Sequence, residues 1–100
     1  MNDIQFISND KDEDAFVIEE NGQRIAEMAV GILGNEMTVY HTEVAARFEG
    51  QGIAKKLFDA MVDHARKNKL QVIVLCPYVL KQFRRNPEQY QDIWKKGRGR

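Results

Sequence analysis

The stretch "FEGQGIAKKL" (residues 48–57) separates two halves of the chain that have different residue patterns. Gly50 and Gly52 stand two residues apart, and the residues after them have the spacing of an amphipathic helix. Glycine lets the backbone adopt left-handed conformations and approach a ligand closely. The first N–H groups of a helix have no partner within the helix, so this turn either only reverses the chain or presents those groups to an anion. The spacing alone leaves both alternatives open.

The half before this stretch predicts strands joined by short turns. Asn21-Gly22 favours the two-residue turn of a β-hairpin, because both residues accept positive φ. Short connections between consecutive strands indicate an antiparallel meander. The strands are expected at 4–8, 15–20, 23–30 and 36–44, and the acidic run at 9–14 is expected to be a solvated turn.

The half after Gly50 has helical periodicity. Apolar residues over 51–69 recur at the spacing of one buried helical stripe. The nearly continuous apolar run at 70–76 is typical of an interior strand covered on both faces, and a helix between two strands permits a parallel crossover. The expected stripe comprises Ile53, Leu57, Phe58, Met61, Val62 and Ala65.

Two prolines predict the starts of two further helices. Pro77 cannot continue a central strand but suits the first turn of a helix over 77–85. Asn86 is expected to cap a last helix over 86–94, with Gln89 placed to reach back as in a capping box.

Composition restricts the class of protein. The chain has 100 residues, with 15 Lys+Arg balanced by 15 Asp+Glu, and we expect one domain over 1–94 and a basic, disordered tail at 95–100. The balanced charge argues against a broad nucleic-acid-binding surface. The longest apolar run, at 72–76, is far shorter than the ~20 residues that span a membrane. A single cysteine suits a reducing compartment, so we expect a cytoplasmic protein that contacts neither nucleic acid nor membrane.

The segment "VAARFEGQGIAKKLFDAMVDHARKNKLQVIVLCPYV" (residues 44–79) resembles the GNAT superfamily of N-acetyltransferases, whose pyrophosphate loop has the pattern Gln/Arg-x-x-Gly-x-Gly/Ala. The loop matches this pattern at Gly52 and Ala54 and departs from it at Glu49, whose carboxylate is expected to point away from a pyrophosphate. The motifs "HTEV", "FEGQG" and "CPYV" and the Asn-Pro-Glu segment are similar to the minimal YjdJ-like branch, over residues 16–94.

The resemblance implies an α+β fold. Its mixed sheet would contain an antiparallel meander, the pyrophosphate loop with its helix, a parallel fifth strand splayed from the fourth, and a C-terminal helical segment. Acetyl-CoA would be the co-substrate and would lie in the splay. The backbone of Glu43 and Val44 is expected to pair with its pantetheine arm, and Lys55 and Lys56 are expected to assist electrostatically. The backbone amides expected on the pyrophosphate are those of Gln51, Gly52, Ile53 and Ala54.

The implied function is transfer of an acetyl group from the thioester of acetyl-CoA to an amine on a small molecule or a protein. The alternative is an acyl-CoA-binding module that acts as a sensor or protein partner without efficient catalysis. A plain interaction domain remains if the glycines only turn the chain. Because so short a chain leaves little material to enclose an acceptor, that side is expected to be open, to be completed by a homodimer or another protein, or to suit a macromolecular acceptor.

Acetyl transfer requires a neutral amine, stabilisation of the charge that develops on the acetyl oxygen, and accommodation or protonation of the leaving thiolate. Backbone N–H groups near Val44 are candidates to stabilise the charge on the acetyl oxygen. His41 and Glu43 fall on one face of the expected strand, and an imidazole changes protonation near neutral pH. His41 is therefore a candidate base, with a structural histidine as the alternative. Glu43 is a candidate to bind a cationic acceptor, or it is merely exposed.

Cys76 and Tyr78 are the candidates for handling the leaving thiolate. Cys76 precedes the expected helix start at Pro77, and a helix N-terminus favours a thiolate. It could carry the acetyl group transiently or donate a proton, whereas its alternative is inert packing. Many GNAT enzymes use a tyrosine just after the fifth strand, which makes Tyr78 the competing acid; its alternative is a surface aromatic. No Cys/His cluster has metal-ligand spacing, so no metal is expected.

Overall fold

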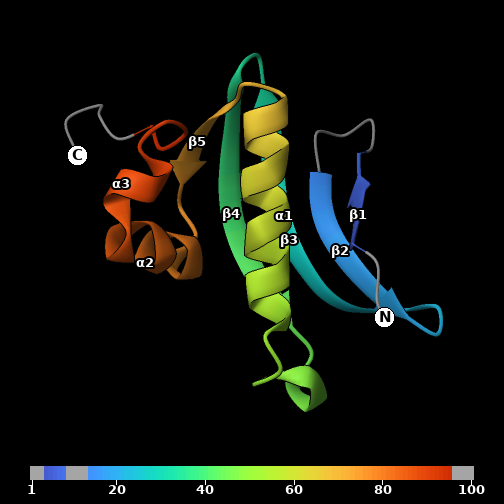
Figure 1. Cartoon of the computed structure of the whole chain (residues 1–100). Helices are drawn as coiled ribbons and strands as arrows, with labels where there is room; N and C mark the ends of the chain where they lie inside the picture. Colours follow the sequence, from blue (N-terminus) through green and yellow to red (C-terminus); the bar gives the residue numbers. More distant parts are fainter. Residues whose placement is uncertain (1–3, 9–13, 96–100) are drawn as a thin grey trace.

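The computed structural model describes residues 4–8 and 14–95, which form a five-stranded sheet with its strands in sequence order (Figure 1). The strands are β1 (Ile4–Ile7), β2 (Asp14–Glu20), β3 (Gln23–Leu33), β4 (Glu36–Val44) and β5 (Gln71–Val74). Neighbouring strands pair antiparallel from β1 to β4, and β5 pairs parallel with β4. The predicted α+β sheet, with a meander and a parallel fifth strand, is confirmed.

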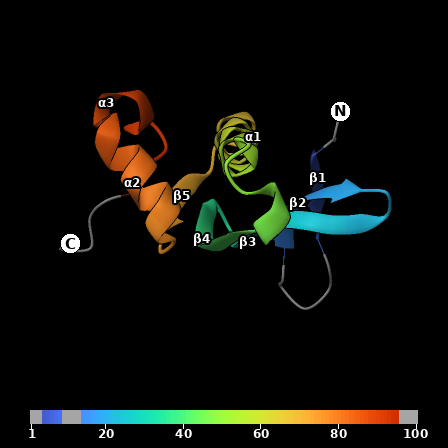
Figure 2. The ribbon, with the colours of Figure 1, turned by 90° about the horizontal axis from the view of Figure 1, so that it is seen from below.

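The helices lie on one side of the sheet. Figure 2 shows α1 packed across one face, with α2 and α3 beyond the β5 edge on the same side, and no described helix on the opposite face. We call that opposite face the bare face. The helical elements are the 3-10 turn η1 (Ala46–Phe48), α1 (Ile53–Lys67), α2 (Pro77–Arg85) and α3 (Pro87–Tyr90). In the part of the chain that the structure describes, none of them has the length and apolar character needed to cross a membrane.

The β2–β3 hairpin turns at the predicted pair. Asn21 and Gly22 have φ of 54° and 79°, the positive values that this two-residue turn requires. The predicted turn at 9–14 falls mostly on residues outside the described part of the chain, and Asp14 already belongs to β2.

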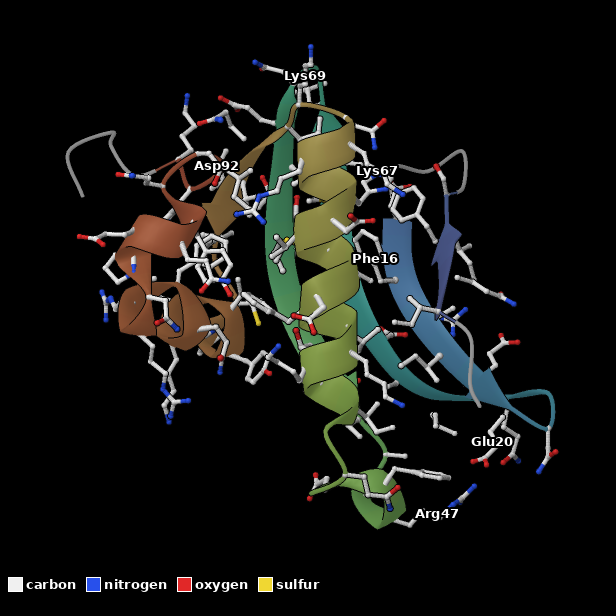
Figure 3. The ribbon with its side chains drawn as sticks, in the orientation of Figure 1. Phe16, Glu20, Arg47, Lys67, Lys69 and Asp92 are labelled. Atoms are coloured by element: carbon white, nitrogen blue, oxygen red, sulfur yellow. The ribbon has the colours of Figure 1, made fainter. Side chains whose placement is uncertain are left out.

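Helix α1 supplies most of the helical side of the core. Its buried residues are the six of the predicted stripe, Ile53, Leu57, Phe58, Met61, Val62 and Ala65. The helix is shorter than the predicted 51–69, because Gly52 is its left-handed N-cap and Asn68 its C-cap. Next to the core, the ring of His64 lies 4.6 Å from that of Phe6 and 5.4 Å from that of Phe16, which extends from β2 toward α1 (Figure 3).

Strand β5 was expected to be interior, but it is the last named strand of the sheet. Its outer edge is covered instead by the end of the described chain. The N–H of Val72 donates to Ile93 (2.6 Å), and the N–H of Lys95 donates to Val72 (2.9 Å). Val72 is fully buried as a result, whereas Leu75, just past the strand, is 61% exposed. Lys95, predicted to open the disordered tail, is therefore bound to the sheet; 96–100 lie outside the described residues.

The predicted helix over 86–94 is also shorter than expected. Helix α3 ends at Tyr90, because the residues after it turn toward the core and pair with the β5 edge. Asn86 is the N-cap residue of α3, as predicted, but its side chain makes no cap hydrogen bond. Its carbonyl accepts from the N–H of Gln89 at 3.0 Å, and its own N–H donates to the carbonyl of Phe83 at 3.3 Å. Tyr90 and Trp94 pack around Phe83, with ring centroids 4.9 Å and 5.3 Å from it.

A β-bulge interrupts the pairing of β3 with β4. Ala29 pairs with His41 and Val30 with Val39, so Tyr40 has no partner residue in β3. The β5 strand pairs with β4 only as far as Val39. The remainder of β4 therefore has no strand along that edge in the described structure, and this opening is the predicted splay.

The ion pair between Arg66 and Asp92 ties the C-terminal segment to α1 (Figure 3). The guanidinium donates to both carboxylate oxygens, at 3.0 and 3.2 Å, and to the Gln89 carbonyl at 2.7 Å. Hydrogen bonding from Arg66 lowers the pKa of Asp92 below its usual value. A carboxyl whose pKa is lower in the folded state contributes stability above its unfolded pKa and loses it as the pH falls.

We predict that Asp92→Asn lowers the free energy of unfolding at pH 7 by about 0.5–1 kcal/mol, because the pair is largely exposed. The difference from wild type should shrink as the pH falls below the unfolded pKa of about 3.9 and should be smallest at about pH 2, because the lowered folded pKa keeps the carboxylate charged until then. Urea unfolding at the two pH values measures this. Asp63→Asn is the matched control, since its pair with Lys67 joins residues of one helix. An equal difference at both pH values would contradict the assignment.

Candidate active site

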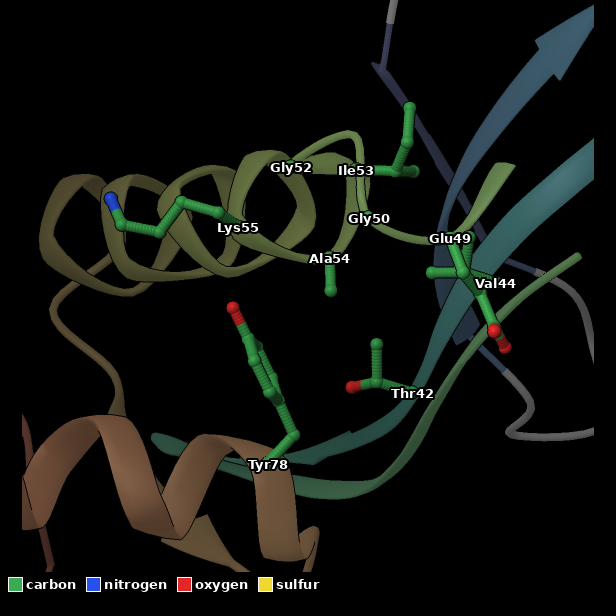
Figure 4. Close-up of a pocket in the computed structure, with 9 residues that line it drawn as sticks. All are labelled: Thr42, Val44, Glu49, Gly50, Gly52, Ile53, Ala54, Lys55 and Tyr78. Atoms are coloured by element: carbon green, nitrogen blue, oxygen red, sulfur yellow. The ribbon is translucent and has the colours of Figure 1, made fainter. Parts of the chain in front are cut away.

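A pocket of about 340 Å³ lies where the start of α1, the end of β4 and the start of α2 meet (Figure 4). It coincides with the splay beyond the bulge. Its lining residues are Thr42, Val44, Glu49, Gly50, Gly52, Ile53, Ala54, Lys55 and Tyr78. Six residues that the sequence analysis proposed for catalysis or cofactor binding are among them: Val44, Gly52, Ile53, Ala54, Lys55 and Tyr78.

The loop before α1 leaves its backbone donors free. Gly50 and Gly52 have φ of 81° and 77°, and a Cβ added to either would have no heavy atom within 4 Å. These left-handed conformations suit glycine and leave the loop surface open. In the described part of the chain, no hydrogen bond to another protein group is made by the N–H groups of Gln51, Gly52, Ile53 and Ala54. The head of α1 therefore has donors that could receive an anion.

The end of β4 offers backbone groups to the same pocket. The N–H of Ala45 donates to the carbonyl of Ile25 in β3 at 2.8 Å. Backbone groups alternate between the two edges of a strand, so those of Glu43 also face β3, while those of Thr42 and Val44 face the open edge. The sequence analysis expected the backbone of both Glu43 and Val44 to face the splay. The alternation places the backbone groups of Val44 there but turns those of Glu43 toward β3. The second residue whose backbone faces the splay is Thr42.

Tyr78 forms the α2 side of the pocket. Its ring packs edge-on against Phe58, with centroids 6.4 Å apart, and its hydroxyl points into the pocket (Figure 4). Burial raises the pKa of Tyr78 above the usual value of 10.0, while the charges of Lys55 and Arg85 act in the opposite direction. The phenol therefore keeps its proton at neutral pH and is available as a donor.

Two charged residues of the loop region border the pocket. The ammonium of Lys55 lies 2.8 Å from Asp59 one turn along α1, and this hydrogen bond raises the pKa of Lys55. Glu49 lines the pocket, but its carboxylate is directed past Val44 and away from Gly52 (Figure 4). This orientation is the one expected for a carboxylate at that position of the loop.

Cys76 lies behind the pocket wall. It is the N-cap of α2, as predicted, but it is only 1% exposed and does not line the pocket. Its sulfur lies 3.3 Å from the hydroxyl oxygen of Thr42, which separates it from the pocket. A ligand in the pocket would thus meet Thr42 and Tyr78 before Cys76.

His41 and Glu43 lie on the bare face, because side chains alternate along β4 and Thr42 lines the pocket. Their nearest nitrogen and oxygen atoms are 3.9 Å apart, so the prediction that they share a face is confirmed. Glu27 of β3, which the sequence analysis did not single out, is the register partner of Glu43. Single ligand atoms from these three side chains lie within 4.8 Å of one another.

A second hollow, of about 240 Å³, lies beside this cluster. It is lined by Glu27 and Glu43 and also by Val44, which lines the first pocket as well. Val44 is therefore the point where the two hollows approach each other. Thr42 and Glu27 are the two site residues that the sequence analysis missed; the alternation of β4 could have indicated Thr42, but only the strand register reveals Glu27.

Comparison with known proteins places this geometry in a family. The family model for GCN5-related N-acetyl-transferases matches residues 15–93. The structure of ribosomal-protein-S18-alanine N-acetyltransferase from Escherichia coli is similar, with a TM-score of 0.65 and 15% identity over 74% of this chain and 66% of that chain. For ribosomal-protein-alanine N-acetyltransferase from Brucella melitensis biovar Abortus 2308 the TM-score is 0.62, with 21% identity over 92% and 70% of the two chains.

A GCN5-like protein from Staphylococcus aureus, solved by NMR, has a TM-score of 0.61 and 29% identity, and the match covers 95% of this chain and 91% of that one. No curated protein matches the sequence significantly. The narrower likeness to the YjdJ-like branch stays a prediction. Since the family model covers most of the chain and the solved acetyltransferases share its fold, the chain belongs to the GCN5-related N-acetyltransferase family, whose members transfer an acyl group to an amine.

Proposed function

We propose that this protein transfers the acetyl group of acetyl-CoA to a primary amine. The observation that carries the proposal is the set of four free N–H groups at the start of α1, from Gln51 to Ala54, beside the gap between β4 and β5. A helix start binds a phosphate well when its N–H groups have no competing acceptor, and the helix dipole adds to the attraction. The open space around Gly50 and Gly52 fits a diphosphate close to the backbone.

The residues that follow the loop suit the rest of such a ligand. From the head of α1 the pocket continues to Thr42 and Val44, whose backbone groups face the open edge of β4. A pantetheine arm carries amides, which pair with such an edge as a further strand would. An N–H of this edge near Val44 is also suited to hydrogen-bond the acetyl oxygen, where negative charge develops during acyl transfer.

The amine is proposed to arrive from the bare face. Val44 borders both hollows, so an amine in the second hollow would approach a thioester held in the first. Glu43 and Glu27 line this hollow, and Glu27 is paired there with Arg24. His41 lies beside the two carboxylates, so that Glu43 can attract an ammonium group and His41 can accept its proton. The roles of His41 and Glu43 as base and acceptor-binding residue are thus retained as proposals, with Glu27 added.

Tyr78 is proposed as the acid that protonates the departing thiolate. Its hydroxyl points into the pocket and remains protonated at neutral pH because burial raises its pKa. Cys76 is the weaker candidate, since Thr42 stands between its sulfur and the pocket. In this arrangement Cys76 orients Thr42 through their contact and does not meet the substrate.

The acceptor is proposed to be exposed on a chain or surface larger than a metabolite. No described helix covers the bare face, and Glu27 and Glu43 of that face line the second hollow. A protein N-terminus or lysine can reach Val44 across such a surface without being enclosed. The alternative, an acyl-CoA-binding module without catalysis, keeps the first pocket but makes no use of the cluster on the bare face.

We predict that Gly52→Glu abolishes coenzyme A binding, because a carboxylate would meet the diphosphate and a side chain is strained at this φ. Gly34→Glu is the matched control: its φ of 62° is also left-handed, a Cβ there has no heavy atom within 4 Å, and it lies in the β3–β4 turn. Isothermal titration calorimetry measures binding. If Gly52→Glu binds coenzyme A as tightly as wild type, the glycines only turn the chain.

We predict that Tyr78→Phe slows acetyl transfer by about 10²-fold, as expected for loss of a positioned acid, with little change in coenzyme A affinity. Cys76→Ala should retain most of the activity. Thiol release from acetyl-CoA, followed with a panel of amines and amine-bearing peptides, measures both. Activity that survives in Tyr78→Phe but is lost in Cys76→Ala would make Cys76 the acid in place of Tyr78. If the wild type releases no thiol with any acceptor, the binding module is favoured.

A further inference from the structure

Three side chains that can ligate a metal ion converge on the bare face from two neighbouring strands. His41 and Glu43 come from β4 and Glu27 from β3, and one ligand atom of each lies within 4.8 Å of the other two. The side chains of His41 and Glu43 are 49% and 74% exposed, and that of Glu27 is 28% exposed. The three groups are therefore close enough to bind one ion and accessible to it from solvent.

The bulge at Tyr40 brings this cluster together. Before the bulge, Met37 and Val39 are buried on the helical side of the sheet. Uninterrupted alternation would carry His41 and Glu43 to that same side. The extra residue turns them to the bare face instead, where β3 presents a carboxylate beside them.

The protein does not balance the negative charge of this cluster. Glu27 and Glu43 are register partners, and like charges directly opposite each other destabilise a sheet. Arg24 pairs with Glu27 at 3.0 Å, but Glu43 forms no ion pair with a lysine or arginine of the described chain. Its contact is with Nδ1 of His41, at 3.9 Å. A divalent cation bound by both carboxylates would remove their repulsion.

The ligand types and their spacing suit a transition metal ion. In a tetrahedral zinc site, metal–ligand bonds of about 2.0–2.2 Å place the ligand atoms roughly 3.4 Å apart. The 3.9 Å between His41 and Glu43 is close to this value, and small rotations of exposed side chains would close the difference. An imidazole nitrogen with two carboxylates favours Zn²⁺ over Ca²⁺ and Mg²⁺, which prefer oxygen ligands alone.

We infer that Glu27, His41 and Glu43 form a binding site for a divalent transition metal ion, with Zn²⁺ as the matching ion. The sequence analysis expected no metal because it considered the spacing of Cys and His along the chain, whereas only the strand register brings Glu27 to the other two. The site itself does not depend on the proposed function. One consequence does rest on that function: a bound ion would occupy the groups proposed to receive the amine, so Zn²⁺ would inhibit acetyl transfer.

Calorimetric titration of ZnCl₂ into the untagged, metal-free protein tests the site. Wild type should bind about one equivalent of Zn²⁺, and His41→Ala and Glu43→Gln should each weaken binding by about tenfold or more, since even the loss of a residue that supports a metal ligand costs this much. Two controls should keep the wild-type affinity. His64→Ala removes the other imidazole of the chain, and Glu36→Gln removes a carboxylate from the opposite end of β4.

Circular dichroism melts would verify that each variant is folded. A wild type that binds no Zn²⁺, or that binds CaCl₂ as tightly, would overturn the inference, as would controls that lose as much affinity as the cluster variants. The titration contains neither coenzyme A nor an acceptor, so its outcome is separate from that of the proposed function. Acetylation of a peptide, followed by mass spectrometry, should slow at saturating Zn²⁺; an unchanged rate would overturn the inhibition and leave the metal site in place.

Discussion

The arrangement of this site depends on one extra residue in β4. Tyr40 has no partner in β3, and the bulge that it forms shifts the pairing by one position. A shift of one residue moves every following side chain to the other face of a strand. Met37 and Val39 are buried under the helices, whereas after the bulge Thr42 and Val44 take that side. The bulge also coincides with the end of β5 pairing, so the same feature opens the splay.

Helix α1 both packs against the sheet and offers backbone donors at its start. Six residues of one stripe are buried and hold the sheet, while its first turn leaves N–H groups without protein partners. Free donors at a buried position would be costly, but at the mouth of a pocket they are solvated until a ligand replaces the water. The cost of leaving the helix start unsatisfied is therefore small, and the gain appears when an anion is bound.

The C-terminal segment holds the second wall of the pocket in place. Phe83 of α2 packs against Tyr90 and Trp94, and the segment that carries these two rings is tied to α1 by the ion pair of Arg66 with Asp92. It is through this packing that Tyr78 meets the head of α1. The sheet then divides the candidate site between its faces: the pocket lies on the helical side, and the bare face carries Glu27, His41 and Glu43. The two sides meet at Val44.

Local sequence patterns were enough to predict the meander, the Asn21-Gly22 turn, the buried stripe of α1 and the glycine loop. Each of these depends on neighbouring residues and on backbone preferences that act over a few positions. They failed where segments distant in the chain compete for the same partner. The end of the chain covers the β5 edge instead of continuing α3, and the bulge sets Glu27 opposite Glu43. Whether Tyr78 or Cys76 borders the pocket was likewise decided by packing, since both are close to the start of α2 and only the placement of Thr42 separates them.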